Sequence, residues 1–331
     1  MTERILITGG AGFIGFHIAK RLACAGYELC LADNLSRGVQ DVDLRKLLSN
    51  SKVSLVETDL LNHNAVARLG TDFHAIFHLA AIIGVRHVLK RPYDVLAHNT
   101  RMLDNVIALA RCQTACSRFL FASTSEIYAG TLEHFDLVVP TPEHTPLALT
   151  ALESPRASYM LSKIMGEALV QHSDLPFTIF RPHNIYGPRM GMAHVIPEQL
   201  KRAFDATPGD SMPVYSPDHR RAFCYVDDAV EMLERMLTCE FCEGVTLNLG
   251  TQSPEVTIRE VVQTCTDIVG KALQLENLPA TPGSPARRAP DMAKTNQLLG
   301  YQSQVSLRRG IEKTWHWYRE NVFQPSGVSA L

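Results

Sequence analysis

A glycine-rich turn near the start of the chain constrains the fold more than any other feature. The segment 8–15, Thr-Gly-Gly-Ala-Gly-Phe-Ile-Gly, lies between a short apolar strand and a helical stretch with one apolar face. Both G-x-x-G-x-x-G and G-x-G-x-x-G spacings occur in it, through Gly9, Gly10, Gly12 and Gly15. Glycines at such a corner permit a tight turn and bring the helix N-terminus close to a pyrophosphate. The turn therefore predicts a dinucleotide site, although a glycine-rich turn alone often makes only a tight corner.

Strands and helices alternate regularly through the first half of the chain. Apolar runs predict strands at 4–8, 27–32, 53–57, 75–79, 118–122 and 177–181. Longer amphipathic stretches predict helices at 93–112 and 155–172. Repeated strand–helix–strand units of this length predict an α/β fold, in which helices cover both faces of a doubly wound, Rossmann-type parallel sheet.

After Pro182 this rhythm loosens, and proline and glycine recur up to Pro217. A helix is expected from Asp227, a strand at 245–249 and a capping box at Thr257 and Glu260. A proline-rich loop at 279–290 and a final helix around Trp315 and Tyr318 complete the expected elements. We expect residues 1–181 and 222–251 to form the dinucleotide-binding domain. Residues 182–221 and 252–331 would form a smaller, irregular α/β lobe that binds the substrate.

Charge and cysteine content exclude several other classes of protein. In 331 residues, Lys and Arg total 32 against 34 Asp and Glu, so electrostatic capture of nucleic acid or of an anionic membrane is not expected. No apolar run reaches the roughly 18 residues of a membrane helix, and the chain starts directly as a strand. Cys239 and Cys242 have C-x-x-C spacing without a second ligand pair, so no metal site is expected. These features predict a cytoplasmic enzyme or binding protein.

Two aspartates follow predicted strands at positions suited to adenosine. Asp33 ends the second strand about 20 residues after the glycines, where a carboxylate accepts from ribose hydroxyls and repels a 2′-phosphate. NAD is therefore expected rather than NADP, a preference that Arg37 weakens slightly; a plain turn aspartate is the alternative. Asp59, after the third strand, could accept from the adenine amino group or, equally, cap a helix.

A tyrosine and a lysine four residues apart are the candidate catalytic pair. Tyr159 and Lys163 fall in a predicted helix, so both side chains lie on one face. A lysine ammonium one turn away favours the phenolate of a tyrosine, which is otherwise a poor base at neutral pH. Thr124, Ser125 and Glu126 follow the fifth strand, where a parallel sheet opens to ligands. They could bridge the substrate to the tyrosine, or could form an ordinary capping turn.

These motifs together resemble the extended short-chain dehydrogenase/reductase family, in its NAD-dependent nucleotide-sugar epimerase, dehydratase and decarboxylase branches. The resemblance covers essentially the whole chain. It comprises 8–15, His-Leu-Ala-Ala at 78–81, Asn99, 123–128, 159–163, 181–189, 221–228 and 288–291.

The resemblance implies a role for each matching residue. Tyr159 would be the base, Lys163 its partner on the nicotinamide ribose, and Thr124 the substrate-bonding hydroxyl. Further NAD contacts are implied at Phe13, Ile14, Asn34, Leu60, Ala80 and Asn99. A nucleotide diphosphate would be held by Asn184, Arg221 and Arg288, with Val195 near the base. Arginine suits phosphate well, but Arg221 has Arg220 beside it in the sequence and Arg288 has Arg287. The family pattern alone favours Arg221 and Arg288 as the arginines that point toward the substrate.

Three reactions are compatible with this site. Epimerisation through a transient keto sugar, at C4 of a UDP-sugar, is the main expectation. Decarboxylation of a UDP-glucuronate-type substrate is the alternative, since 124–126 and 187–190 both resemble that branch. A 4,6-dehydratase usually has Asp where this chain has Ser125. A non-catalytic dinucleotide sensor is less compatible with a retained Tyr159–Lys163 pair. The family also suggests a homodimer packed through the helices that carry Asn99 and Tyr159.

Overall fold

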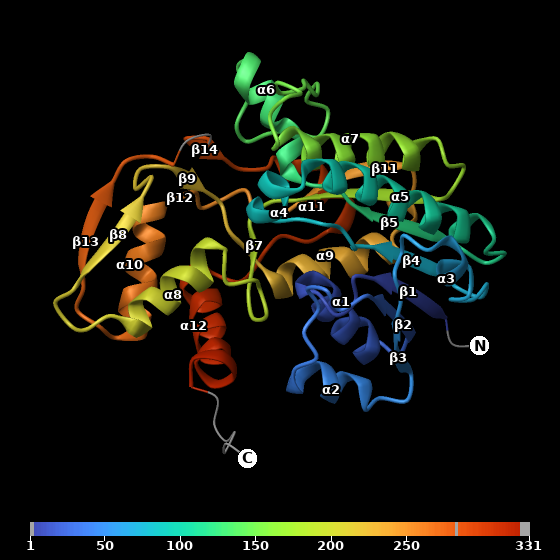
Figure 1. The fold of residues 1–331 in the computed structure, drawn as a ribbon, viewed down its shortest axis with the longest axis horizontal. Helices are drawn as coiled ribbons and strands as arrows, with labels where there is room; N and C mark the ends of the chain where they lie inside the picture. The colour runs from blue at the N-terminus through green and yellow to red at the C-terminus, as the bar shows by residue number, and fades with distance from the viewer. Residues whose placement is uncertain (1–2, 282–283, 325–331) are drawn as a thin grey trace.

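The computed structural model describes residues 3–281 and 284–324, which form a large sheet-containing lobe and a smaller second lobe (Figure 1). Seven strands pair in parallel in the order β11-β6-β5-β4-β1-β2-β3. They are β1 (Arg4–Thr8), β2 (Glu28–Asp33), β3 (Val53–Glu57), β4 (Ala75–His78), β5 (Arg118–Ala122), β6 (Phe177–Pro182) and β11 (Val245–Leu249). This topology confirms the predicted Rossmann-type fold, and β11 joins the sheet from late in the sequence.

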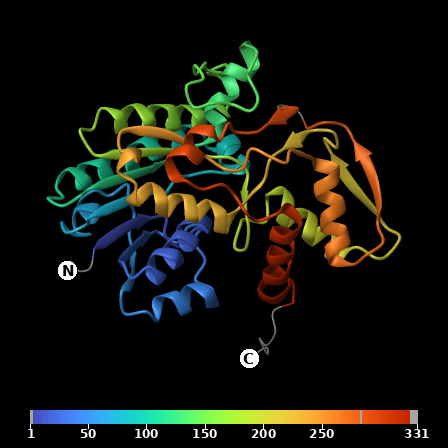
Figure 2. The same ribbon diagram turned by 180° about the vertical axis from the view of Figure 1, so that it is seen from behind.

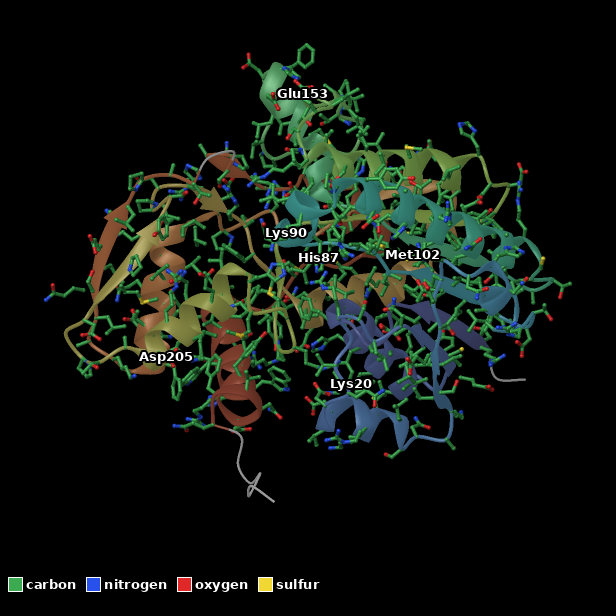
Figure 3. The ribbon with its side chains drawn as sticks, in the orientation of Figure 1. Lys20, His87, Lys90, Met102, Glu153 and Asp205 are labelled. Carbon is green, nitrogen blue, oxygen red and sulfur yellow. The ribbon has the colours of Figure 1, made fainter. Side chains whose placement is uncertain are left out.

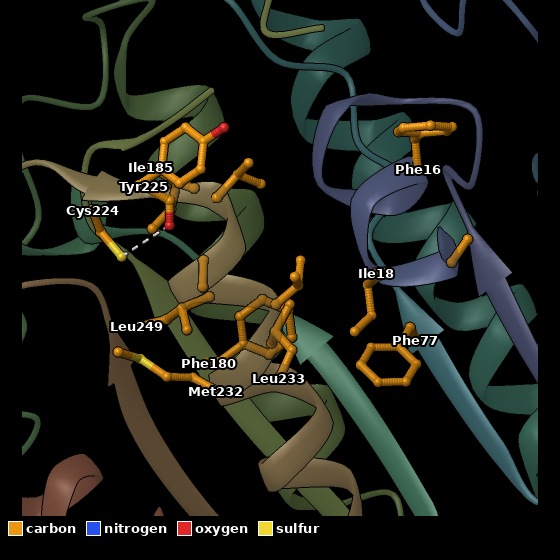
Figure 4. Close-up of a cluster of buried hydrophobic side chains, with 14 of the residues drawn as sticks. Phe16, Ile18, Phe77, Phe180, Ile185, Cys224, Tyr225, Met232, Leu233 and Leu249 are labelled. Atoms are coloured by element: carbon orange, nitrogen blue, oxygen red, sulfur yellow. Dashed lines mark hydrogen bonds between the residues drawn. The ribbon is translucent and has the colours of Figure 1, made fainter. Parts of the chain in front are cut away.

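Alternating side chains of each strand point into two separate cores. Ile5 and Ile7 of β1 pack toward α1 (Phe13–Cys24) and α9 (Val226–Thr238). The intervening Leu6 packs toward the helices of the other face, which are α3 (His63–Ala67), α5 (Pro92–Arg111) and α7 (Ala157–Gln171). Figure 2 shows α9 across one face of the sheet, and Figure 4 shows part of the first core. Because apolar side chains are buried on both faces, the strands read as continuous apolar runs.

The second lobe is more regular than the sequence suggested. Its β8 (Ser211–Tyr215) pairs in parallel with β13 (Gln274–Leu278) over five residues. Its helices are α8 (Val195–Asp205), α10 (Ile258–Val269) and α12 (Leu307–Tyr318). The capping box at Thr257 and Glu260 is confirmed at the start of α10. Lys20 on α1 and Asp205 on α8 mark the two lobes in Figure 3. The expected boundaries between the lobes stay a prediction.

Short elements complete the second lobe and its connection to the sheet. A three-stranded sheet is formed by β12 (Val256–Thr257), β9 (Arg220–Arg221) and β14 (Arg287–Arg288). The remaining pair is β7 (Ile185–Tyr186) with β10 (Cys224–Tyr225), and α11 (Ala293–Leu299) follows β14. The sequence predicted a loop at 279–290, but Arg287 and Arg288 form a strand because β9 offers a parallel partner. Residues 282–283 of that loop lie outside the described residues.

The remaining α-helices lie in the larger lobe. They are α2 (Val42–Leu48), α4 (Val85–Lys90) and α6 (Ala129–His134), with a 3-10 turn, η1, at Ser125–Tyr128. The segment 129–156 stands out above the sheet, and Glu153 marks it in Figure 3. Among the described residues, no helix combines the length and the apolar character needed to cross a bilayer.

Candidate active site

A cavity of about 790 Å³ lies where the carboxyl ends of the sheet strands meet the second lobe. Its walls include the glycine-rich turn and the segment after β5 on one side, and residues from 182–196 with Arg288 on the other. In open α/β sheets this edge is where ligands bind. The cavity therefore brings together segments that are far apart in the sequence.

The glycine-rich turn forms one wall of the cavity, and a side chain would not fit at Gly9 or at Gly15. Gly9 has a φ of +72°, and its N–H donates to Ala32 O at 2.8 Å. A Cβ on Gly15 would lie 2.1 Å from Gly9 O, which no side chain could relieve. Gly12 is the N-cap residue of α1 and supplies no side-chain cap, so the first N–H groups of the helix face the cavity. This cradle fits a dinucleotide pyrophosphate.

Asp33 lies at the end of β2, as the sequence predicted, and lines the cavity. Its Oδ2 accepts from Ala11 N at 3.0 Å and its Oδ1 from Leu35 N at 2.8 Å. Two backbone donors therefore fix the carboxylate in place while its remaining lone pairs stay available to ribose hydroxyls. The other cavity-lining residues among the expected NAD contacts are Phe13, Ile14, Asn34, Leu60 and Ala80.

Four expected cofactor contacts lie outside the cavity wall, namely Tyr159 and Lys163, described below, and Asp59 and Asn99. Asp59 is exposed, and its Oδ1 accepts from Leu61 N at 3.0 Å; the N-cap of α3 is Asn62 instead. Asn99 is buried behind the wall, where its Oδ1 accepts from Ile82 N at 2.7 Å and its Nδ2 donates to Ile82 O at 3.1 Å. It thereby holds the loop after β4, which does line the cavity. Direct contact of either residue with NAD stays a prediction.

Tyr159 and Lys163 lie on one face of α7, beside the end of β5. Lys163 is almost fully buried, and its Nζ donates to Ala122 O at 2.7 Å and lies 6.0 Å from the centre of the Tyr159 ring. Burial raises the pKa of the Tyr159 phenol above its ordinary value, an effect that the hydrogen bond with Thr124 opposes. Burial lowers the pKa of Lys163 to about 8, and the Glu167 carboxylate opposes that shift. The structure thus brings together the predicted tyrosine, lysine and threonine.

Thr124, Ser125 and Glu126 all line the cavity. Thr124 Oγ1 accepts from Glu126 N at 3.2 Å, so the threonine also caps η1, as the alternative interpretation suggested. Ser125 is buried, whereas the Glu126 side chain is half exposed and reaches the second lobe. The hydroxyl and the carboxylate are therefore placed on the same cavity wall.

Arg288 joins the two lobes at the cavity. Its Nη1 lies 2.5 Å from Glu126 Oε1, and its Nη2 donates to Asn184 Oδ1 at 3.1 Å. Asn184 has a left-handed φ of +45° and also donates to Ala222 O. The Nε of Arg288 is buried without a hydrogen-bond partner among the described residues. An arginine on the cavity wall is suited to an anionic ligand.

The strand register resolves which arginine of each adjacent pair faces inward. Arg288 pairs with Arg221, and Arg287 with Arg220, across β14 and β9. Because side chains alternate along a strand, Arg221 and Arg288 share one face. On the other face, Arg287 forms an ion pair with Glu255.

Arg221 is buried and lies behind the cavity wall. It donates to Ser284 Oγ at 3.1 Å and to Pro285 O at 2.6 Å. Burial and the neighbouring Arg288 lower its pKa to about 10, and the Glu126 carboxylate opposes that shift in part. Val195, at the start of α8, lines the cavity as expected for a residue near the base. Substrate contacts by these residues stay predictions.

The sequence analysis missed Arg189 as a site residue. Its Nε pairs with Asp41 at 2.7 Å, and its guanidinium lies 3.9 Å from the centre of the Phe16 ring. It donates to Val39 O at 2.8 Å, so it connects the loop after β7 with the loop after β2 across the cavity. Its place in the Gly-Pro-Arg string at 187–189 was the only available signal.

Comparison with known proteins gives consistent matches. Residues 5–250 match the NAD dependent epimerase/dehydratase family. A UDP-N-acetyl-alpha-D-glucosaminuronate decarboxylase from Bacillus cytotoxicus is 31% identical, over 97% of this chain and 99% of its own. UDP-glucuronic acid decarboxylase 1 from Xenopus tropicalis is also 31% identical, over 97% of this chain and 73% of its own.

Solved structures show the same fold. A Bacillus cereus UDP-glucuronic acid 4-epimerase, in complex with UDP-glucuronic acid and NAD, has a TM-score of 0.81 at 24% identity, covering 96% of this chain and 99% of that one. A UDP-glucose 4-epimerase from Thermotoga maritima has a TM-score of 0.79 at 25% identity, with the same coverage. The chain therefore belongs to the NAD dependent epimerase/dehydratase family and is an NAD-dependent enzyme of the nucleotide-sugar group.

Proposed function

We propose that this enzyme decarboxylates a UDP-linked uronic acid, releasing carbon dioxide and a UDP-pentose. The named relatives at 31% identity are decarboxylases of UDP-uronates and match nearly the whole chain. Epimerisation at C4, the main expectation from the sequence, becomes the second candidate. It is kept because 4-epimerases share the fold and the same first chemical step would serve both reactions.

The observation that carries the proposal is the position of Arg288 and Glu126. A uronate differs from a neutral hexose by one carboxylate, and a guanidinium on the cavity wall can hold it. Arg288 is held from two sides by Glu126 and Asn184, and we assign it to this carboxylate rather than to the diphosphate that the resemblance implied. Arg221, on the same face of the small sheet, adds positive charge for the diphosphate.

Tyr159 begins the reaction by taking the proton from the C4 hydroxyl of the sugar. Lys163 stabilises the phenolate by its charge, and Thr124 orients the hydroxyl through its own hydrogen bond. NAD, which the glycine turn and Asp33 would hold, would supply reversible hydride transfer at C4, so that no net redox would occur.

Loss of carbon dioxide follows from the C4 ketone. The C5–C6 bond breaks, its electron pair moves into the enolate formed with the ketone, and the carboxylate carbon leaves as carbon dioxide. One proton then adds to C5. Glu126 lies on the cavity wall beside Thr124 with its side chain half exposed, and we propose that it relays this proton from solvent to C5.

Incubation with UDP-glucuronate, followed by NMR and carbon dioxide release, tests the proposal. We expect a UDP-pentose, stoichiometric carbon dioxide and no accumulation of NADH. A product of unchanged mass would establish the epimerase instead. Tyr159→Phe is expected to abolish turnover in either case while NAD stays bound, whereas a non-catalytic sensor would be indifferent to it.

We also propose a homodimer that packs through α5 and α7. The exposed apolar side chains of Tyr93 on α5 and of Met165 and Leu169 on α7 support this surface. Sedimentation of wild type and of Met165→Glu tests it: we expect a dimer that the added charge weakens. A monomeric wild type would contradict the proposal.

A further inference from the structure

A buried glutamate directly behind the catalytic pair has no part in the chemistry above. Glu167 lies on α7, four residues after Lys163, and its side chain is 5% exposed. Burial of a carboxylate is unfavourable unless it is paired and hydrogen-bonded. Its partners therefore indicate what the residue is for.

The Glu167 carboxylate is fully engaged by two strand ends. Ser123 Oγ, after β5, donates to Oε1 at 2.5 Å. Arg181, near the end of β6, donates from Nε to Oε1 at 2.9 Å and from Nη2 to Oε2 at 2.7 Å. This is a two-pronged ion pair with a side chain, Arg181, that is only 6% exposed.

Arg181 extends the network to the segment after Thr124. Its Nη1 donates to Tyr128 Oη at 2.7 Å and to Glu143 O at 2.8 Å. Tyr128 ends η1, the turn that Thr124 caps. The ion pair thus holds both flanks of the Thr124 loop.

Helix α7 is joined to β5 at two successive points. Lys163 Nζ bonds Ala122 O, and one helical turn later Glu167 bonds Ser123. Thr124 is the next residue of the chain, and its hydroxyl acts on the Tyr159 phenol to lower its pKa. Any slip between α7 and β5 would separate Thr124 from Tyr159.

We propose that Glu167 and Arg181 are positioning residues, which hold Thr124 against Tyr159 and keep negative charge behind Lys163. This inference rests on the proposed function only where kinetics with a UDP-uronate are used to test it. An alternative is that the pair merely stabilises the fold. Buried ion pairs can often be replaced by apolar residues without loss of stability, so stability alone does not explain its presence.

The charges around Lys163 give the pair a measurable signature. The groups facing Lys163 are Tyr159 and Glu167 from α7 and His78 from β4, with Arg181 of β6 behind Glu167. Glu167 favours the charged form of Lys163. Its removal also leaves Arg181 uncompensated, and both changes disfavour the ammonium. The alkaline limb of the kcat–pH profile should therefore move to lower pH.

Three variants separate positioning from stability. Glu167→Gln removes the charge, the double variant Glu167→Leu/Arg181→Met removes the whole pair, and Ser123→Ala removes one hydrogen bond and no charge. Asp228→Asn is the control, because Asp228 is a buried carboxylate that accepts from Tyr301 Oη, Gln304 N and Val305 N outside the cavity wall.

We expect the double variant to melt near wild type and to retain NAD, while kcat falls about 100-fold with little change in KM. Ser123→Ala should lose about tenfold in kcat without moving the alkaline limb. The control should leave kcat and the limb unchanged.

A second readout needs no substrate. Ultraviolet titration of Tyr159, obtained by subtracting the Tyr159→Phe spectrum, should show a higher phenol pKa in Glu167→Gln. The proposal would be overturned if the double variant and Ser123→Ala both showed the kcat, the alkaline limb and the Tyr159 titration of the wild type. An altered Tyr159 titration in an enzyme that turns over no UDP-uronate would support it and reject the proposed function alone.

Discussion

The two ends of the cavity are built by different means. The glycine-turn end, formed by Gly9, Gly12, Gly15 and Asp33, uses backbone groups and contacts between nearby segments. The bond from Ala11 N to Asp33, for example, spans 22 positions. The arginine end, formed by Asn184, Arg221 and Arg288, uses side chains, and its contacts from Arg288 span 104 and 162 positions. The glycine-turn end should therefore tolerate no added side-chain volume. The arginine end should tolerate a change in side-chain volume but not the loss of a charge.

The largest expected effect is that of one methyl group at the glycine-turn end. Gly15→Ala would place Cβ 2.1 Å from Gly9 O and 2.9 Å from Gly10 Cα, both of which are backbone atoms. We expect NAD affinity to fall by about 100-fold, or roughly 3 kcal/mol, the upper range for overpacking. Calorimetric titration of NAD measures this effect.

Gly26→Ala is the matched control for that variant. Gly26 has a φ of +96°, but its Cβ would meet nothing within 4 Å. Backbone strain of about 1 kcal/mol should lower the melting temperature and leave NAD affinity intact. Wild-type NAD binding by Gly15→Ala would remove the distinction between the two ends.

This difference in construction also explains what could be predicted from the sequence. The glycine turn, Asp33 and the Tyr159–Lys163 pair depend on a strand, a corner and one helical turn, so their spacing fixes their geometry. Thr124 follows from its place at the end of a parallel strand. The parallel pairing of the central sheet follows from the repeated strand–helix units.

The rest depends on tertiary pairing that no local pattern encodes. Which arginine of each pair lies on the same face as its partner depends on the register of β9 with β14, and the sequence predicted a loop where β14 lies. Asn99 and Asp59 lie close to the expected site yet turn to backbone partners. Arg189 acts across the two lobes, which no spacing along the chain reveals.

The next effect tests the arginine end directly. Arg288→Met keeps much of the side-chain volume but removes the charge that faces Glu126 and Asn184. We expect kcat/KM for the UDP-uronate to fall about 100-fold, near the upper limit of a hydrogen bond to a charged group, with NAD content unchanged. Steady-state kinetics and bound-NAD analysis measure both quantities.

The adjacent arginine supplies the control. Arg287→Met breaks a half-exposed pair with Glu255 on the opposite face, which should change stability by less than about 1 kcal/mol and leave kinetics unaltered. Equal losses for the two variants would mean that the register of β14 does not select the functional arginine.

A smaller effect is expected where the two lobes are tied together. The Arg189 side chain is 3% exposed in its pair with Asp41, and its Nη2 also donates to Ala11 O of the glycine turn at 3.5 Å. In Arg189→Met we expect NAD to dissociate about tenfold faster, because about 1.4 kcal/mol of closure is lost. Stopped-flow displacement of NAD measures the rate.

Arg202→Met controls for loss of an arginine away from the cavity. Its pair with Glu198 lies within α8 and is half exposed, so the NAD dissociation rate should stay at the wild-type value. An unchanged rate in Arg189→Met as well would show that the tie does not retain the cofactor.

The smallest effect compares the two ends through acid. His78, behind the glycine turn, and His183, beside Asn184, are both buried, and burial lowers the pKa of each to about 3. The unfolded chain therefore binds more protons than the folded one below pH 6.5, and the free energy of unfolding falls as pH drops from about 6.5 toward 3. Each histidine contributes a slope of about 1.4 kcal/mol per pH unit.

His183→Phe should remove one such contribution, since the His183 Nδ1 has no partner among the described residues and only Nε2 bonds Asn248. Denaturant unfolding between pH 4 and 7 measures the slope, and NAD titration should be unaltered because the change lies at the arginine end. A slope equal to that of wild type would mean that His183 is protonated in the folded enzyme, and that the arginine end holds less positive charge than its two arginines, Arg221 and Arg288, suggest.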